Sequence, residues 1–127
     1  LTAHIFSCDV EGALRLLDEL FYMRIEPMII LYTVFSAYTD LYRAFAASQD
    51  GVPLSAAAAA FDYGKRTFLL ERAARQLRRF DAKKLSLSFS ALLEADKSFK
   101  SFGADGRIIL EKLIVRLCRI ISTGADL

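Results

Sequence analysis

The residues best suited to nucleophilic or metal chemistry are one histidine and two cysteines in a chain of 127 residues. His4 and Cys8 lie four positions apart, a spacing that puts two side chains on one face of a helix. Such a pair could supply two zinc ligands, or a cysteine nucleophile with its histidine base. A structural zinc site needs about four ligands, and the carboxylates of this chain follow no recognisable ligand spacing. We therefore interpret His4 as a surface side chain and Cys8 as an ordinary buried thiol, and we expect no metal and no catalytic residue.

The pair Gly64 and Lys65 is the nearest approach to a phosphate-binding loop. That loop follows the pattern G-x-x-x-x-G-K-[ST], in which glycines let backbone N–H groups approach the phosphates and the hydroxyl holds magnesium. Here Ala59 replaces the first glycine and Arg66 replaces the hydroxyl residue. The sequence therefore predicts no ATP binding by this route and no cofactor.

Basic residues concentrate in one segment of the chain, which we call the basic segment, residues 65–84. It carries a net charge of +6, against −5 for residues 1–64 and +1 for residues 85–127. Its cations are Lys65, Arg66, Arg72, Arg75, Arg78, Arg79, Lys83 and Lys84. The sequence predicts one basic helix followed by a turn.

Four of these cations are candidate contacts to a protein or nucleic-acid partner. Arg72, Arg75 and Arg79 follow the spacing of a single helix face, and Lys83 lies in the predicted turn after them. No aromatic residue is interleaved on the predicted arginine face, so stacking of single-stranded bases gains little support. A plain solvated face, a protein contact and a nucleic-acid contact all stay open at this point.

Asp96 falls at a core position of its predicted helix, where a carboxylate must be paired or lie at a wet edge. Lys100, one turn further on, and Arg116 in the last predicted helix are the candidate partners. We interpret Asp96 and Lys100 as a structural pair. Gly103 is expected to end the same helix, and Asp105 to cap the next one.

The elements that position these residues are predicted to be helices, because apolar residues recur at helical spacing along nearly the whole chain. The expected fold is all-α, a compact bundle of about six to seven helices in a single domain. The helices are expected at about 1–6, after an Asp9 cap, from Pro27 to about Ala47, from a Ser55 cap to Phe61, from Lys65 to Phe80, from an Asp81 cap to Phe102, and after the Asp105 cap. The helix that starts at Pro27 is expected at the centre, with inward positions Leu31, Phe35, Tyr38, Tyr42 and Phe45.

Composition sets limits on the class of protein. Apolar residues, with glycine included and tyrosine left out, make up about 55% of the chain, against ~45–50% in typical soluble domains. The longest uncharged stretch, residues 27–39, is shorter than the ~20 residues of a membrane-spanning helix. Two cysteines in a chain without a visible signal sequence indicate reduced thiols and a cytoplasmic location. Because the chain begins at Leu1, we expect a fragment of a longer subunit, with a helical domain at 1–122 and a disordered tail at 123–127.

Two segments resemble a known protein family. The first is VEGALRLLDEL at residues 10–20, followed by Glu26-Pro27 and a long apolar helix; the second is EADKSFKSFGAD at residues 94–105, followed by ILEKLI at 109–114. Between them, Gln76 and Arg79-Phe80 fall where the family has a turn between helices. In this order and spacing, the segments resemble the C-terminal domain of the delta subunit of the bacterial DNA polymerase III clamp loader. Phe102 departs from the pattern, which usually has the first of two glycines there.

The resemblance implies a helical collar domain that packs with the collar domains of the gamma/tau and delta-prime subunits in a ring of five. It also implies no active site in this chain, no small-molecule substrate, and contact with the sliding clamp and DNA only through domains that this chain lacks. Part of the apolar surplus would then lie on faces that meet the neighbours. The alternative function is a helical nucleic-acid-binding module that uses the basic segment.

Overall fold

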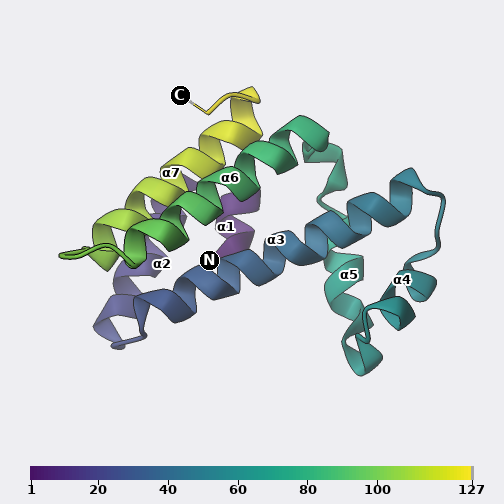
Figure 1. Ribbon diagram of the computed structural model, residues 1–127, viewed down its shortest axis with the longest axis horizontal. Helices are drawn as coiled ribbons and strands as arrows, with labels where there is room; N and C mark the ends of the chain where they lie inside the picture. Colours follow the sequence, from purple (N-terminus) through teal and green to yellow (C-terminus); the bar gives the residue numbers. More distant parts are fainter. Residues whose placement is uncertain (127) are drawn as a thin grey trace.

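Helices make up the regular structure of residues 1–126, which the computed structural model describes (Figure 1). They are α1 (Thr2–Phe6), α2 (Val10–Tyr22), α3 (Pro27–Gln49), α4 (Leu54–Ala60), α5 (Thr67–Ala74), α6 (Ala82–Phe99) and α7 (Gly106–Thr123), with two short 3-10 helices, η1 (Gly64–Arg66) and η2 (Leu77–Arg79). This part of the chain contains no strand, so the predicted all-α fold is confirmed. None of the described helices is long and apolar enough to cross a membrane.

The long helix α3 runs the length of the molecule and positions the other helices (Figure 1). Pro27 lies in its first turn, where a backbone N–H would have no acceptor within the helix, so the missing N–H of proline costs no hydrogen bond. In the view of Figure 1, α2 lies near the first turns of α3, whereas α4 and α5 lie toward its other end, and α6 and α7 run side by side along it. Seven α3 side chains are buried, which is why this helix forms the centre of the core: Ile30, Leu31, Val34, Tyr38, Leu41, Ala44 and Ala47.

Aromatic rings hold the middle of the core together. The rings of Phe6, Tyr38 and Phe80 meet edge to face, with centroids 5.3 to 6.0 Å apart. Phe89 of α6 joins the same cluster at 6.2 Å from Tyr38. Edge-to-face packing places the positive ring edge on the negative ring face, which adds to the gain from burying the rings. The cluster therefore ties α1, α3, α6 and the end of η2 into one core.

Local signals set several helix boundaries. The side chains of Asp9, Asp81 and Asp105 accept hydrogen bonds from backbone N–H groups in the first turns of α2, α6 and α7. The predicted helix end at Phe102 and Gly103 is wrong, because α6 ends at Phe99; Gly103 lies in the turn that follows, in a left-handed conformation with φ of 73°, which other L-residues adopt at a cost. A Cβ at Gly106 would lie 2.9 Å from Pro27 Cβ, so the start of α7 packs directly on the start of α3.

The prediction of one helix from Lys65 to Phe80 is wrong. The structure breaks this stretch into η1, α5 and η2, and Phe80 is extended, with φ of −124° and ψ of 156°. The reason is tertiary: Phe80 turns into the aromatic cluster, and Arg79 donates to the carbonyl of Phe6 at 3.0 Å. Arg72, Arg75 and Arg79 consequently share no continuous helix face.

Two smaller expectations are also wrong. Ser55 does not cap the alanine-rich helix, because α4 begins at Leu54 and Pro53 occupies the N-cap position. Tyr42 does not point into the core; it is 54% exposed, although its ring still meets Phe89 edge to face. The broad apolar surface of α3 therefore continues onto the outside of the molecule.

Residues 124–126 fold back onto α7. This helix ends at Thr123, and Gly124 follows in the left-handed conformation that commonly ends helices. The carboxylate of Asp126 then pairs with Arg116, with Arg116 Nε 3.0 Å from Asp126 Oδ1. The domain boundary at residue 122 stays a prediction, and the last residue of the expected tail, Leu127, lies outside the described residues.

Candidate functional site

The structure separates His4 from Cys8. α1 ends at Phe6, and the backbone at Cys8 is left-handed, with φ of 60°, so no continuous helix face carries both side chains. His4 Nδ1 lies 3.1 Å from Asp9 Oδ2, whereas the thiol of Cys8 accepts a hydrogen bond from the hydroxyl of Ser122 at 3.3 Å. The two residues therefore form neither a ligand pair nor a nucleophile with its base.

Both cysteines are free thiols at the contact between α1 and α7. Cys118 is buried beside the carbonyl of Ile5, and burial raises the pKa of its thiol to about 11. A thiol with a raised pKa carries little thiolate at neutral pH and is a poor nucleophile. Within residues 1–126, no group of three or more His, Cys, Asp or Glu side chains could hold a metal ion.

Asp96 pairs with Lys100 at 3.0 Å, one of its two candidate partners. This hydrogen bond and the charge of Asp96 raise the pKa of Lys100. Arg116, the other candidate, instead pairs with Glu94 at 3.0 Å and with Asp126, and its hydrogen bond to Asp126 raises its pKa. The carboxylate of Asp96 thus lies at a half-buried edge of α6 next to a solvated lysine.

The basic segment divides into cations that bond to the backbone and cations that face solvent. Arg79 donates to the carbonyl of Phe6 at 3.0 Å, and Lys84 Nζ donates to the carbonyl of Ile121 at 2.8 Å. Both carbonyls lie in the last turns of their helices, where no intrahelical N–H is available to them. The exposed members are Lys65, Arg66, Arg72, Arg75, Arg78 and Lys83. Arg72 packs against the ring of Phe68, with its guanidinium carbon 5.7 Å from the ring centroid.

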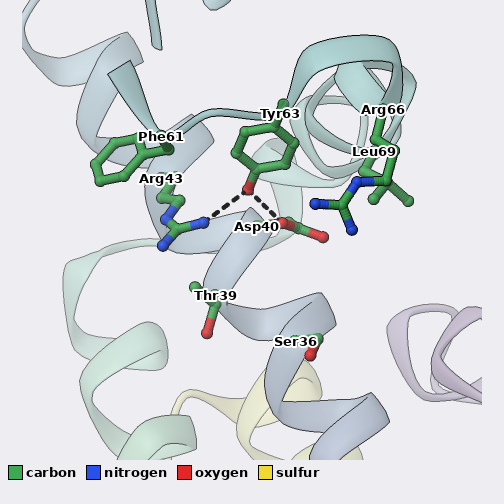
Figure 2. A pocket seen from close by; sticks show the side chains of 8 residues that line it. All are labelled: Ser36, Thr39, Asp40, Arg43, Phe61, Tyr63, Arg66 and Leu69. Carbon is green, nitrogen blue, oxygen red and sulfur yellow. Dashed lines mark hydrogen bonds between the residues drawn. The ribbon is translucent and has the colours of Figure 1, made fainter. Parts of the chain in front are cut away.

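A hollow of about 320 Å³ lies between the second half of α3 and the α4–α5 segment (Figure 2). We call it the α3/α5 hollow, and its lining residues are Ser36, Thr39, Asp40, Arg43, Phe61, Tyr63, Arg66 and Leu69. Figure 2 shows the Tyr63 hydroxyl between Asp40 and Arg43, with Arg66 on the far side of Asp40. The Tyr63 hydroxyl donates a hydrogen bond to Asp40 Oδ1 and accepts one from Arg43 Nη1 at 3.2 Å.

Two aromatic rings hold Arg43 in place in this hollow. The guanidinium carbon of Arg43 lies 4.3 Å from the ring centroid of Phe61 and 5.7 Å from that of Tyr63. Burial raises the pKa of Tyr63, and its hydrogen bond to Asp40 raises it further, so the hydroxyl stays protonated and able to donate. Among residues 1–126, no carboxylate lies within 4.0 Å of the guanidinium nitrogens of Arg43 or Arg66.

Sequence reasoning missed this hollow. Asp40 and Arg43 are three residues apart on α3, whereas Phe61 and Tyr63 follow α4. The one available signal is the pair of opposite charges, Asp40 and Arg43, on a helix that is otherwise uncharged. Nothing local indicates that a tyrosine 20 residues after Arg43 returns to bond with it.

A family model described as DNA polymerase III delta subunit, C-terminal domain, matches residues 1–117. The chain belongs to this family. No curated protein and no solved structure matches the chain significantly. The family places the chain in the clamp loader of DNA replication, so the resemblance seen in the sequence is confirmed.

This delta-family domain has one end rich in exposed apolar side chains. α2 turns into α3 and α6 turns into α7 at the same end of the molecule (Figure 1). We call the exposed side chains there the apolar end: Tyr22, Met23, Ile29, Tyr32 and Phe102. Tyr22 is 90% exposed and Met23 is 65% exposed, and apolar side chains that are exposed together can mark a contact site for another protein.

Proposed function

We propose that this delta-family domain is a non-catalytic oligomerisation domain in the cytoplasm. It packs with the collar domains of the gamma/tau and delta-prime subunits, so that the full complex can load the sliding clamp during DNA replication. The clamp and the DNA are reached through other domains of the delta subunit. The match of the delta C-terminal family over residues 1–117 carries this proposal.

The apolar end supports the proposal. Burial of apolar surface stabilises an interface by roughly 25 cal/mol per Å² before the costs of association are counted. Tyrosine and methionine are also enriched in the buried parts of protein interfaces. Tyr22, Met23 and Phe102 are exposed in the described part of the chain, and a neighbouring subunit would remove them from water.

The test is assembly with purified partners. The chain is mixed with the gamma/tau and delta-prime subunits of the same organism at micromolar concentration, and the mass of the product is measured by size-exclusion chromatography with light scattering. We expect one species that contains all the subunits. If the chain elutes alone at every ratio, the proposal is wrong.

A second candidate function is nucleic-acid binding through the basic segment. Arg75, Arg78 and Lys83 are exposed, and within residues 1–126 none of them lies within 4.0 Å of a carboxylate. Exposed cations without a carboxylate partner can neutralise the phosphates of a nucleic acid and release the counterions bound to it. The split of the segment into α5 and η2 reduces the area that they present as one surface.

Fluorescence anisotropy with a labelled DNA duplex tests this second candidate at several salt concentrations. Substitution of Arg72, Arg75 and Lys83 by alanine should weaken binding and flatten its dependence on salt. Arg79 is left unchanged because it bonds to α1. If the unmodified chain does not bind at low salt, this function is excluded.

A further inference from the structure

The α3/α5 hollow is lined by two arginines and one aspartate, so it is positively charged, and in the described part of the chain no carboxylate lies within 4.0 Å of either guanidinium group. Arg43 is held by Phe61, Tyr63 and the hydrogen bond to the Tyr63 hydroxyl, so its planar group is fixed before any ligand arrives. Only one of its nitrogens donates to a described side chain. An arginine fixed in this way can donate two parallel hydrogen bonds to a carboxylate at little further entropic cost.

The other residues of the hollow point to the kind of anion. Phe61 is 51% exposed and Leu69 also lines the hollow, so a ligand meets apolar surface beside the guanidinium groups. Asp40 contributes a negative charge inside the hollow, which disfavours a phosphate backbone with its many charges. A volume of about 320 Å³ admits a side chain and the residues next to it.

A second hollow, of about 200 Å³, continues the first along α3. It shares Asp40 and Leu69 with the first hollow and extends to Arg72 and Gln76 of the basic segment. The two hollows together form a groove lined by three arginines, Arg43 and Arg66 in the first hollow and Arg72 in the second. Such a groove matches an extended or helical protein segment that carries acidic residues.

We propose that the α3/α5 hollow receives an aspartate or glutamate side chain from a neighbouring clamp-loader subunit, with Arg43 and Arg66 as the residues that bind its carboxylate. The proposal rests on the proposed oligomerisation function and assigns part of the interface to this groove. The apolar surface of Phe61 packs against the same segment of the partner.

The experiment compares charge reversals at two neighbouring residues of η1, Arg66 and Lys65. Arg66→Glu places a negative charge in the hollow, and Lys65→Glu makes the same change at the exposed neighbour in η1 that does not line it. Affinity for the gamma/tau and delta-prime subunits is measured by biolayer interferometry. We expect Arg66→Glu to weaken binding about tenfold or more and Lys65→Glu to change it less than about threefold, since one lost charge pair of this kind exceeds about 1.4 kcal/mol.

Arg43→Gln gives a second measurement and should also weaken binding, because glutamine is uncharged and cannot hold a carboxylate with two parallel bonds. Circular dichroism melts identify any variant that does not fold, and Arg66 is an exposed residue whose change leaves the core intact. Binding that is unchanged in Arg66→Glu, or weakened equally in Lys65→Glu, overturns the hollow as an acid receptor while oligomerisation stands.

Two further results of the binding experiment would each overturn the proposal in a different way. If the unmodified chain binds neither subunit, the oligomerisation function itself fails and the assignment of the hollow falls with it. If Arg66→Glu weakens binding to a DNA duplex but not to the subunits, the hollow is a phosphate site and the proposal is wrong.

Discussion

At the scale of single residues, the bond from Arg79 to the Phe6 carbonyl joins the basic segment to α1 and gives a prediction about stability. Arg79→Ala leaves the last turn of α1 without this donor and should lower the free energy of unfolding by about 1–2 kcal/mol. The exposed neighbour provides the control, and Arg78→Ala should change stability by less than about 0.5 kcal/mol. Urea unfolding followed by circular dichroism measures both. Equal stability of the two variants would contradict the structural role of Arg79.

Asp9 gives a prediction about acid sensitivity. The N–H of Gly12 and the side chain of His4 lower the pKa of this carboxyl below its ordinary value of 3.8. A lowered folded pKa contributes stability above 3.8, and that contribution is lost as the pH falls through the folded value. Asp9→Asn keeps the cap but not the charge, so its melting temperature should fall less steeply than that of the unmodified chain between about pH 5 and pH 2.

The matched control for this acid series is Asp50→Asn, which removes one carboxylate from the exposed end of α3. Its melting temperature should follow the unmodified chain across the same range. An identical slope in Asp9→Asn and in the unmodified chain would show that the cap charge does not contribute.

Single residues also show which partners a sequence can and cannot reveal. Asp9 and Asp81 are predictable caps, because a cap bonds to N–H groups only three residues further along the chain. Arg79 belongs to the predicted exposed face, but it bonds to a carbonyl 73 residues away in the sequence. Contacts of that kind depend on the assembled fold, so residue type and spacing cannot identify them.

At the scale of elements, the turn between α6 and α7 carries a prediction. A Cβ at Gly103 would meet no atom within 4 Å, so a substitution there is opposed only by the left-handed backbone. Gly103→Ala should therefore destabilise the domain by about 1 kcal/mol, and Gly103→Asn by less, because asparagine tolerates this conformation better. Thermal melts of the two variants measure the difference. If asparagine destabilises the turn as much as alanine does, backbone strain is not the cause.

Helices that begin at a strong local signal are predictable from the sequence, whereas the broken helical stretch at residues 65–80 is not. Pro27 in the first turn of α3 and the aspartate caps mark helix starts in the sequence itself. The stretch 65–80 has good helix formers throughout, yet it breaks before Phe80 because burial of this ring in the aromatic cluster stabilises the fold more than a continued helix would. Tertiary packing overrides propensity in this segment.

At the scale of the whole molecule, the arrangement of the helices predicts uneven local stability. Only Ala57 and Ala58 of α4 are buried, whereas seven residues of α7 are. Local opening of a helix with few buried contacts leaves the core intact and exposes its amides to exchange. Hydrogen–deuterium exchange followed by mass spectrometry should show α4 amides exchanging much faster than those of α7. Uniform protection across both helices would contradict this view.

The fold class of the molecule is predictable from its sequence, but the α3/α5 hollow is not. Helical periodicity and apolar surplus indicate a helical bundle directly. The hollow arises where α3, the segment after α4 and η1 meet, and its hydrogen bonds join residues 20 and 23 positions apart. A surface assembled from separate segments leaves no single pattern in the sequence.

The contact between α1 and α7 has a consequence for synthesis. Cys8 lies against Ser122 and Cys118 against Ile5, so α1 packs against α7, which is made about 100 residues later. During translation α1 is made before α7, so Phe6 of α1 can meet Tyr38 and Phe80 before the contacts of Cys8 and Ile5 with α7 can form. The core around α1 is therefore completed only after α7 has left the exit tunnel, because Cys118 and Ser122 of α7 supply its last contacts.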